Sequence, residues 1–152
     1  SNQSEEQFQI KEELARIVYL FKNNNVQFRT ALDSNKSPEV FIDKSHLNRV
    51  LTNLIKNSLQ AEKENQPIEV KVELTKQEDR YLVKISDNGV GIPPEIEDKI
   101  FEPNFTTKNS GMGLGLAIVK KIITDFSGEI NYQTSSQGTV FEFTIPIKRI
   151  KK

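Results

Sequence analysis

Hydrophobic residues recur at helical spacing in three long stretches of the chain. These are residues 5–22, residues 44–64 and residues 114–126. In each stretch the apolar side chains return every three or four positions, so they share one side of a helix. We therefore expect three amphipathic helices, each of which needs an apolar surface to cover, and a short further helix over residues 95–100.

Alternating apolar and polar positions predict strands between these helices. Helices and strands do not follow one another in strict alternation, so a purely parallel sheet is not expected. The pattern predicts an α+β fold, a two-layer sandwich in which helices cover one face of a mixed sheet. The predicted strands are residues 26–30, 40–42, 68–74, 81–85, 130–132 and 139–145.

Composition narrows the classes of function. The 152 residues fit one domain, and 21 Lys and Arg balance 21 Asp and Glu. A net charge of zero gives no overall field toward nucleic acid, so no nucleic-acid partner is expected. The chain has no cysteine, which excludes disulfides and thiolate metal sites. It contains no apolar run of about 20 residues. We expect it to be cytoplasmic, alone or as the cytoplasmic part of a membrane-bound sensor.

Two asparagines mark the second predicted helix. Asn53 and Asn57 lie four positions apart, hence one above the other at the edge of the apolar face. Amide oxygens are acceptable ligands for Mg²⁺, which prefers oxygen donors. The alternative is that both side chains simply lie on a solvated helix face.

A second polar cluster follows the strand that ends near residue 85. In the stretch "SDNGVGIPPE", Asp87 is followed by Gly89 and Gly91, which allow close approaches that a Cβ would forbid. A carboxylate fixed at a strand end can accept a hydrogen bond from an exocyclic amine such as that of adenine. An ordinary Asn-Gly turn is the alternative interpretation.

The third cluster is glycine-rich and precedes the last helix. Gly111, Gly113 and Gly115 lie where a helix begins, and a helix N-terminus offers unpaired N–H groups and a positive dipole end to phosphate. The spacing fits neither the Rossmann nor the Walker pattern. A flexible turn would look similar.

The order and spacing of these clusters resemble the ATP-binding domain shared by sensor histidine kinases, DNA gyrase, the Hsp90 chaperones and the MutL proteins. The stretch "HLNRVLTNLIKNSLQA" resembles the N box of that family and "DNGVGIP" its G1 box. Likewise "IFEPNFTTK" resembles the F box and "GMGLGLAIVKKI" the G2 box. The resemblance is nearest to the catalytic domain of sensor histidine kinases of the nitrogen-regulation type. It implies a Bergerat-type fold with a mostly antiparallel sheet and about three helices.

The resemblance also implies ATP and Mg²⁺ as ligands. Asn57 would ligate the metal that bridges the phosphates, and Asn53 would contact phosphate or the metal's water, which makes both residues catalytic. Asp87 would accept the adenine N6 hydrogen bond, and Thr139 would close that end of the pocket.

A lid and a phosphate loop complete the implied site. Phe101 and Phe105 would anchor the lid, and the glycines would bring backbone N–H groups to the phosphates. The implied cofactor-binding residues are Asn53, Asn57, Asp87, Gly89, Gly91, Ile92, Phe105, Thr106, Thr107, Lys108, Gly111, Gly113, Leu114, Gly115, Leu116 and Thr139.

Two positions depart from relatives within the resemblance. The gyrase, Hsp90 and MutL branches carry a Glu in the place of Asn53, and an amide cannot act as a general base, which favours a kinase over an ATPase. Kinases of the family often carry Lys or Arg where this chain has Gln60. Lys56, Lys63 and Lys108 are the alternatives for meeting phosphate charge.

The only histidine, His46, lacks the surroundings of a phospho-acceptor and is expected on a helix surface. The chain is therefore expected to be the catalytic half of a kinase that transfers the γ-phosphate of ATP to a histidine on a dimerisation domain. Residues 1–24 would be a linker helix from that module, residues 25–148 the ATP-binding domain and residues 149–152 a basic tail. The expected partners are this phosphotransfer domain and a response regulator, with the isolated domain monomeric. An anti-sigma-type Ser/Thr kinase and a non-catalytic nucleotide sensor are the alternatives.

Overall fold

The computed structural model describes residues 5–32, 40–103, 105 and 115–147. Along the chain its helices and strands are β1 (Glu5–Phe8), α1 (Ile10–Tyr19), β2 (Val26–Thr30), β3 (Val40–Asp43), α2 (Lys44–Gln60), β4 (Val70–Gln77), β5 (Arg80–Asp87), the 3₁₀ turn η1 (Glu97–Lys99), α3 (Leu116–Asp125), β6 (Ile130–Ser135) and β7 (Gly138–Pro146).

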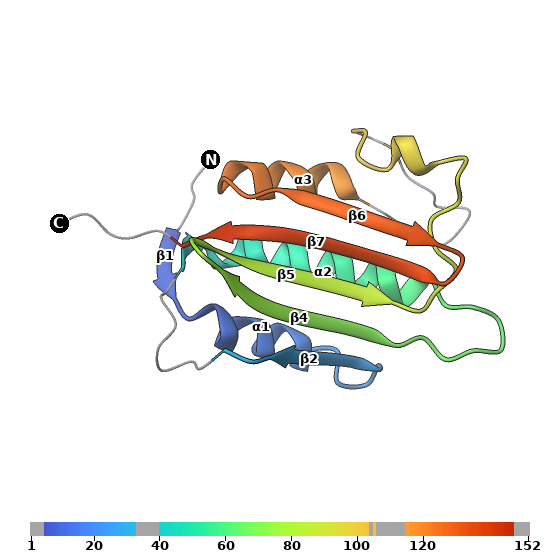
Figure 1. Ribbon diagram of the computed structural model, residues 1–152, viewed down its shortest axis with the longest axis horizontal. Helices are drawn as coiled ribbons and strands as arrows, with labels where there is room; N and C mark the ends of the chain where they lie inside the picture. The colour runs from blue at the N-terminus through green and yellow to red at the C-terminus, as the bar shows by residue number, and fades with distance from the viewer. Residues whose placement is uncertain (1–4, 33–39, 104, 106–114, 148–152) are drawn as a thin grey trace.

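Five of the strands form one mixed sheet in the order β2-β4-β5-β7-β6 (Figure 1). Strand β2 runs parallel to β4, and the other neighbours are antiparallel. Strands β1 and β3 form a separate antiparallel pair at one end of the sandwich. The mixed, mostly antiparallel sheet is confirmed, and β4–β5 and β6–β7 are antiparallel hairpins.

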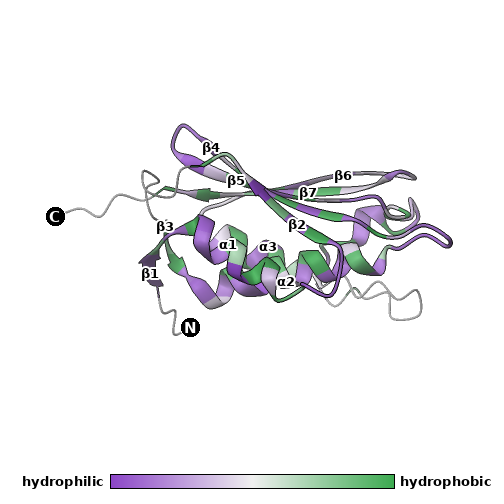
Figure 2. Ribbon diagram, turned by 90° about the horizontal axis from the view of Figure 1, so that it is seen from below, coloured by the Kyte–Doolittle hydropathy of each residue, from purple (hydrophilic) through white to green (hydrophobic). Residues whose placement is uncertain are grey.

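The three helices cover one face of the sheet (Figure 2). Their apolar sides meet the inward side chains of the strands, such as Val83 and Ile85 of β5 and Phe143 of β7, in one hydrophobic core. Helix α2 begins where Oδ1 of Asp43 accepts a hydrogen bond from Ser45 N at 2.8 Å, a side-chain cap that satisfies an N–H at the helix start. Capping therefore fixes where α2 begins and which face it turns to the core.

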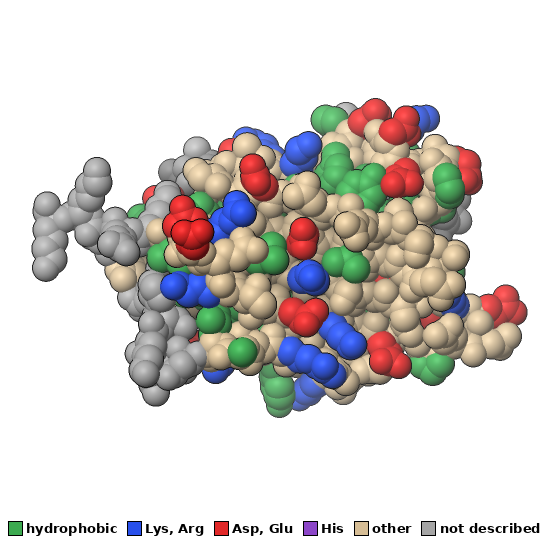
Figure 3. Space-filling model, in the orientation of Figure 1, with side chains coloured by type: hydrophobic (Ala, Val, Ile, Leu, Met, Phe, Trp, Pro, Cys, Tyr) green, Lys and Arg blue, Asp and Glu red, His purple; other side chains and the backbone are tan. Residues whose placement is uncertain are grey.

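The opposite face of the sheet is polar, and one row of it alternates in charge. Arg29, Glu73, Lys84 and Glu142 are register partners across β2, β4, β5 and β7. Figure 3 shows this face, where acidic and basic side chains alternate in a column across the strands. Opposite charges on neighbouring strands favour this pairing. The sheet thus has one dry face and one wet face, as its alternating sequence predicts.

The N-terminal part of the chain corrects one prediction. Residues 5–22 were expected to be a single helix, but Glu5–Phe8 is strand β1 and the helix begins only at Ile10. The strand forms because its backbone pairs with β3, with Phe8 opposite Val40. Helix α1 then buries Ile10, Leu14 and Ile17 in the same core as α2. Its assignment to a preceding module stays a prediction.

Helix α2 also ends earlier than expected, at Gln60 rather than near Glu64. The carbonyl oxygen of Ala61 accepts a hydrogen bond from Val90 N at 2.8 Å, so the chain leaves the helix to meet the loop after β5. Within the described part of the chain, none of the helices combines the length and apolar character needed to cross a membrane.

Candidate functional site

One end of the sandwich gathers the predicted functional segments. The C-terminal end of α2, the end of β5, the β6–β7 turn and the start of α3 all lie at the right of Figure 1. Strands β5 and β6 end there, and α3 begins there. The topology therefore brings together segments that are far apart in the sequence.

The two asparagines contact each other on α2. Asn57 Nδ2 donates a hydrogen bond to Asn53 Oδ1 at 3.1 Å. Asn57 is buried, with 6% of its surface exposed, whereas Asn53 is half-buried. The sequence pattern placed both at the edge of the apolar face, and the structure sets Asn57 deeper. Since its nitrogen is committed to Asn53, the atom of Asn57 suited to a metal is Oδ1.

Both asparagines line a hollow of about 410 Å³ along α2. Lys56 and Gln60 line the same hollow, so a basic residue borders it even though Gln60 has no charge. Among the residues that the structure describes, Lys63 does not line this hollow. The lining comprises Ser45, Asn48, Arg49, Thr52, Asn53, Lys56, Asn57 and Gln60.

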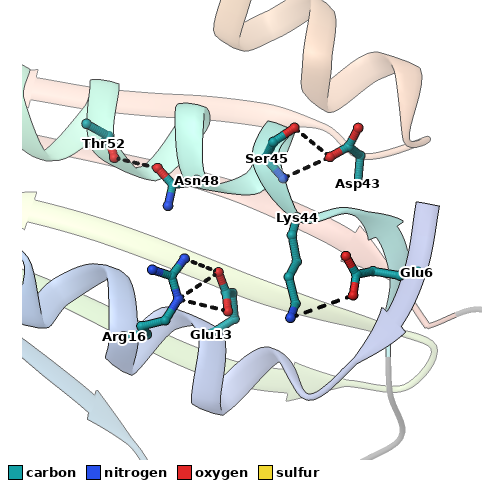
Figure 4. Close-up of polar contacts among 8 residues, drawn as sticks. All are labelled: Glu6, Glu13, Arg16, Asp43, Lys44, Ser45, Asn48 and Thr52. Atoms are coloured by element: carbon teal, nitrogen blue, oxygen red, sulfur yellow. Dashed lines mark hydrogen bonds and ion pairs between the residues drawn. The ribbon is translucent and has the colours of Figure 1, made fainter. Parts of the chain in front are cut away.

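A second hollow of about 440 Å³ adjoins the first where α2 meets α1. Figure 4 shows its polar contacts, in which Arg16 pairs with the buried carboxylate of Glu13. Lys44 Nζ lies 3.7 Å from Oε1 of Glu6 on β1. Ser45 and Asn48 line both hollows, so the groove runs along α2 from the amide pair toward α1.

The donor set decides which metal the site suits. Among the described residues there is no cluster of three or more His, Cys, Asp or Glu that would hold a metal by itself. Helix α2 instead offers amide oxygens beside a hollow, and Mg²⁺ is commonly held by one or two protein oxygens together with substrate phosphates and water. The residues present therefore fit a Mg²⁺ ion that arrives with a phosphate ligand.

Asp87 lies at the end of β5 and is held by backbone donors. Its Oδ1 accepts hydrogen bonds from Gly89 N at 2.8 Å and from Thr139 N at 3.3 Å. Burial raises the pKa of the Asp87 carboxyl above its ordinary value, although hydrogen bonds from Gly89 N, the Ser58 side chain and Thr139 N oppose that rise. Ser58 follows Asn57 on α2, so this bond joins the Asp87 carboxylate to the helix that carries the amide pair.

Glycines around Asp87 permit three close backbone approaches. A Cβ at Gly89 would lie 2.4 Å from Ala61 O, at the end of α2. One at Gly91, where φ is 81°, would lie 2.0 Å from Ser135 O, and one at Gly138, where φ is 134°, would lie 2.0 Å from Asp87 O. Only glycine tolerates such positions. Gly89, Gly91 and Gly138 thus allow α2, the loop after β5 and the β6–β7 hairpin to approach closely, and the role of Gly89 and Gly91 in shaping a base pocket stays a prediction.

Two hydroxyl residues at this site were missed by the sequence analysis. Ser58 bonds to Asp87, and Thr134 on β6 accepts a hydrogen bond from Ile92 N at 2.8 Å. Thr134 Oγ1 also lies 2.8 Å from Thr139 Oγ1. Ser58 lies within the N-box stretch but was given no role there, and Thr134 lies outside the quoted motifs, where only its position opposite Thr139 in the β6–β7 hairpin could have signalled it.

The aromatic residues before the predicted lid pack on the sheet. The rings of Phe101 and Tyr132 lie 5.9 Å apart between centroids, and Lys120 Nζ lies 5.2 Å from the centroid of the Phe101 ring. The Tyr132 hydroxyl donates to Oε1 of Glu97 at 3.2 Å. Phe105 is half-buried against the core. Both predicted anchors are therefore fixed to the sandwich.

The phosphate loop is described only at its end. Gly115 has a left-handed φ of 53° immediately before α3, and the side chain of Leu116 lies in the core, so position 116 can offer only its backbone to a ligand. Ile92 is buried beside Asp87. Six predicted site residues lie outside the described part of the chain: Thr106, Thr107, Lys108, Gly111, Gly113 and Leu114.

His46 lies in the first turn of α2, as predicted for a helix-surface residue. Its Nε2 is 3.8 Å from Oδ2 of Asp43, at the end of the helix away from Asn57. Its side chain is 31% exposed.

Comparisons with known proteins agree with this geometry. The family model described as "Histidine kinase-, DNA gyrase B-, and HSP90-like ATPase" matches residues 42–149. The sensor protein FixL of Bradyrhizobium diazoefficiens is 35% identical over 127 residues, which cover 82% of this chain and 25% of FixL. The sensory histidine kinase/phosphatase NtrB of Vibrio alginolyticus is 28% identical over 93% of this chain and 43% of its own length.

Solved structures show the same fold. The catalytic domain of histidine kinase ThkA superposes with a TM-score of 0.81 at 32% identity and covers 95% of this chain and 96% of that domain. The chain spans about a fifth to a quarter of the length of the first two curated sensor proteins it resembles. The chain therefore belongs to the histidine kinase-, DNA gyrase B- and HSP90-like ATPase family and, within it, to the catalytic ATP-binding domains of two-component sensor histidine kinases.

Proposed function

We propose that this domain binds ATP with Mg²⁺ and transfers the γ-phosphoryl group to a histidine on a dimerisation domain that lies outside this sequence. The observation that carries the proposal is that α2 holds the hydrogen-bonded Asn53–Asn57 pair and, at the next position after Asn57, Ser58, whose side chain hydrogen-bonds to Asp87. An amide pair suits Mg²⁺ and phosphate, while a carboxylate at a strand end suits the adenine amine. The two halves of one nucleotide thus find matching groups at one end of the sandwich.

Each end of the nucleotide has its own set of groups. Asp87 would accept from the adenine N6 amine, with Ile92 and Thr139 beside the base. Asn57 Oδ1 would ligate the metal, and Asn53 would contact phosphate. Lys56 would meet phosphate charge, since it lines the hollow with both asparagines. A bound Mg²⁺ supplies charge neutralisation for the transferring phosphate oxygens.

The transfer needs a nucleophile that this chain does not supply. An imidazole nitrogen of the acceptor would attack the γ-phosphorus, the bond to the β–γ bridging oxygen would break, and ADP would leave with those electrons. Asn53 cannot take a proton from water, so the site lacks the general base that hydrolysis would need at that position. Positioning by α2 and neutralisation of charge would be the main contributions of this domain.

Labelling with γ-³²P-ATP tests the proposal. The chain alone should bind ATP in the presence of Mg²⁺ and remain unlabelled, and adding the histidine-bearing domain of the parent kinase should give acid-labile label on that domain. Strong acid-labile label on the chain itself, or acid-stable label on an added protein, would contradict it.

A response regulator is the proposed final acceptor. The solved structure of ThkA in complex with the response regulator TrrA, which matches this chain with a TM-score of 0.77 at 30% identity, supports this step. Phosphoryl transfer from the labelled histidine domain to a purified receiver domain measures it.

A further inference from the structure

One side chain outside the quoted motifs, that of Thr134, joins the segments around Asp87, where the adenine base is proposed to bind. Thr134 lies in the middle of the contacts between the β6–β7 hairpin and the loop after β5. Its Oγ1 accepts from Ile92 N at 2.8 Å and lies 2.8 Å from Thr139 Oγ1. It therefore connects Ile92, in the loop after β5, with Thr139, whose N–H donates to the Asp87 carboxylate.

Thr139 is in turn fixed at two points. Its N–H donates to Asp87 Oδ1 at 3.3 Å, while its hydroxyl pairs with that of Thr134. Only 4% of its surface is exposed, so the hydroxyl has no ready exchange of partners with water. A buried hydroxyl that keeps one partner is restricted in its rotamer.

The backbone around these bonds leaves little room for adjustment. Gly91 lies against Ser135 O, and Gly138 lies against Asp87 O, each so close that an added Cβ would be 2.0 Å from the carbonyl oxygen. The hairpin and the loop thus already touch through main-chain atoms. The Thr134 hydroxyl adds the directional bonds that set how far each can turn relative to the other.

We propose that Thr134 is a positioning residue for base selection, which holds Ile92 and Thr139 so that the Asp87 carboxylate faces a 6-amino group. This inference rests on the proposed binding of ATP at Asp87 and adds to it the residue that sets its selectivity. A 6-amino purine donates to the carboxylate, whereas a 6-oxo purine presents an oxygen that the carboxylate repels. Both effects depend on alignment, because hydrogen-bond strength falls steeply with angle.

Loss of the hydroxyl has a specific expected consequence. Thr134→Val keeps the branched shape but leaves Ile92 N–H without its acceptor and frees the Thr139 hydroxyl to rotate. In this variant ATP loses its aligned hydrogen bond to the Asp87 carboxylate, whereas ITP does not make that bond even in the wild type. The preference for ATP over ITP should therefore fall by about fivefold to tenfold, the size expected for one buried hydrogen bond.

Calorimetric titration of ATP and ITP, which differ at the 6-position, measures this preference. Thr134→Ser restores the hydroxyl and should restore the ratio. Thr144→Val is the matched control, because Thr144 Oγ1 also accepts a backbone N–H, that of Glu129 at 3.0 Å, but at the other end of the same hairpin. A purely structural role would weaken both nucleotides equally and would leave the ratio unchanged.

Amide hydrogen exchange at Ile92 gives an independent readout. Exchange at Ile92 should be faster in Thr134→Val than in the wild type, Thr134→Ser or Thr144→Val. If Thr134→Val does not fold, Thr134→Ala serves in both measurements.

The outcomes separate this inference from the proposed function. A wild-type chain that binds neither nucleotide contradicts ATP binding, and the inference falls with it. A wild-type chain that binds both equally overturns the Asp87 assignment and the inference but leaves nucleotide binding intact. A wild-type preference for ATP that Thr134→Val retains in full overturns the inference alone.

Discussion

Asn57 donates from Nδ2 to Oδ1 of Asn53 at 3.1 Å, one turn along α2. The bond orients both amides with respect to each other before any ligand is present. Because Nδ2 of Asn57 donates within the pair, the proposed metal ligand is its carbonyl oxygen. The two polar residues therefore act together as one candidate site.

Removing the Asn57 amide should abolish the metal dependence of nucleotide binding. We expect Asn57→Ala to lower the affinity for ATP at least tenfold, about 1.4 kcal/mol, in Mg²⁺ and to have little effect in EDTA. Isothermal titration calorimetry under both conditions measures this. Asn48→Ala, on the same helix and lining the same hollow, is the control, and an equal loss in that variant would speak against a metal role for Asn57.

Lys56 should carry the phosphate interaction that Gln60 cannot make. Lys56 lines the hollow together with the amide pair, and a hydrogen bond between charged groups contributes about 1.5–3 kcal/mol. Lys56→Ala is expected to weaken ATP more than adenosine, while Lys63→Ala should leave both affinities unchanged. Competition titrations of the two ligands decide it, and equal losses from both lysine variants would remove Lys56 from this role.

The charged carboxylate of Asp87 should lower the stability of the ligand-free domain at neutral pH. Burial raises the pKa of its carboxyl in the folded chain above the ordinary value, so its contribution to stability is complete at low pH and is lost as the pH rises through the folded pKa. Asparagine stays neutral and can still accept from Gly89 N and Thr139 N. We expect Asp87→Asn to melt at a higher temperature than the wild type at pH 7 and at a similar temperature near pH 3.

The same substitution should reduce ATP affinity at least tenfold, since an amide oxygen is a weaker acceptor for the adenine amine and the carboxylate charge is gone. Asp87→Asn is therefore expected to raise the melting temperature at pH 7 and to lower the affinity for ATP. Melting curves across pH and calorimetry at pH 7 test the pair. A variant that is less stable than the wild type at pH 7 would show that hydrogen bonding to the carboxylate outweighs its burial.

Gly138 should be intolerant of any side chain. A Cβ there would lie 2.0 Å from Asp87 O, at a φ of 134° that other residues rarely adopt. We expect Gly138→Ala to lower the free energy of unfolding by about 2–4 kcal/mol and to weaken ATP binding. Denaturant unfolding measures the first effect. Gln137→Ala, an exposed neighbour in the same turn, should be close to neutral, and a wild-type-like Gly138→Ala would show that the turn can shift without harm.

Periodicity was sufficient for most of the sandwich, because each helix and strand buries one regular face. Strand β1 was missed for a physical reason. Four residues carry too little pattern, and the strand exists through pairing with β3, more than 30 positions away. The same kind of distant contact, between Ala61 O and Val90 N, ended α2 sooner than its apolar pattern did.

The candidate site likewise contains residues that the sequence pointed to and residues that only distant contacts bring in. Asn53, Asn57 and Asp87 stand in motifs whose resemblance to a known family implied a shared site. In the structure the two asparagines contact each other, and Ser58, the residue after Asn57, contacts Asp87. Ser58 and Thr134 were not predicted, since a hydroxyl in a helix or strand has no pattern of its own. Their importance comes from what the fold sets opposite them.

The contacts of Gly91 and Gly138 have a consequence for how this domain tolerates change. Gly91 approaches the main-chain oxygen of Ser135, and Gly138 approaches that of Asp87, so these contacts between β5, the loop after it and the β6–β7 turn involve backbone atoms. In a saturation library, substitutions at positions 135, 136 and 137 should cost little stability or ATP binding, while Gly91 and Gly138 should tolerate almost no substitution. The domain would then keep a fixed base pocket under a turn whose outer surface is open to variation.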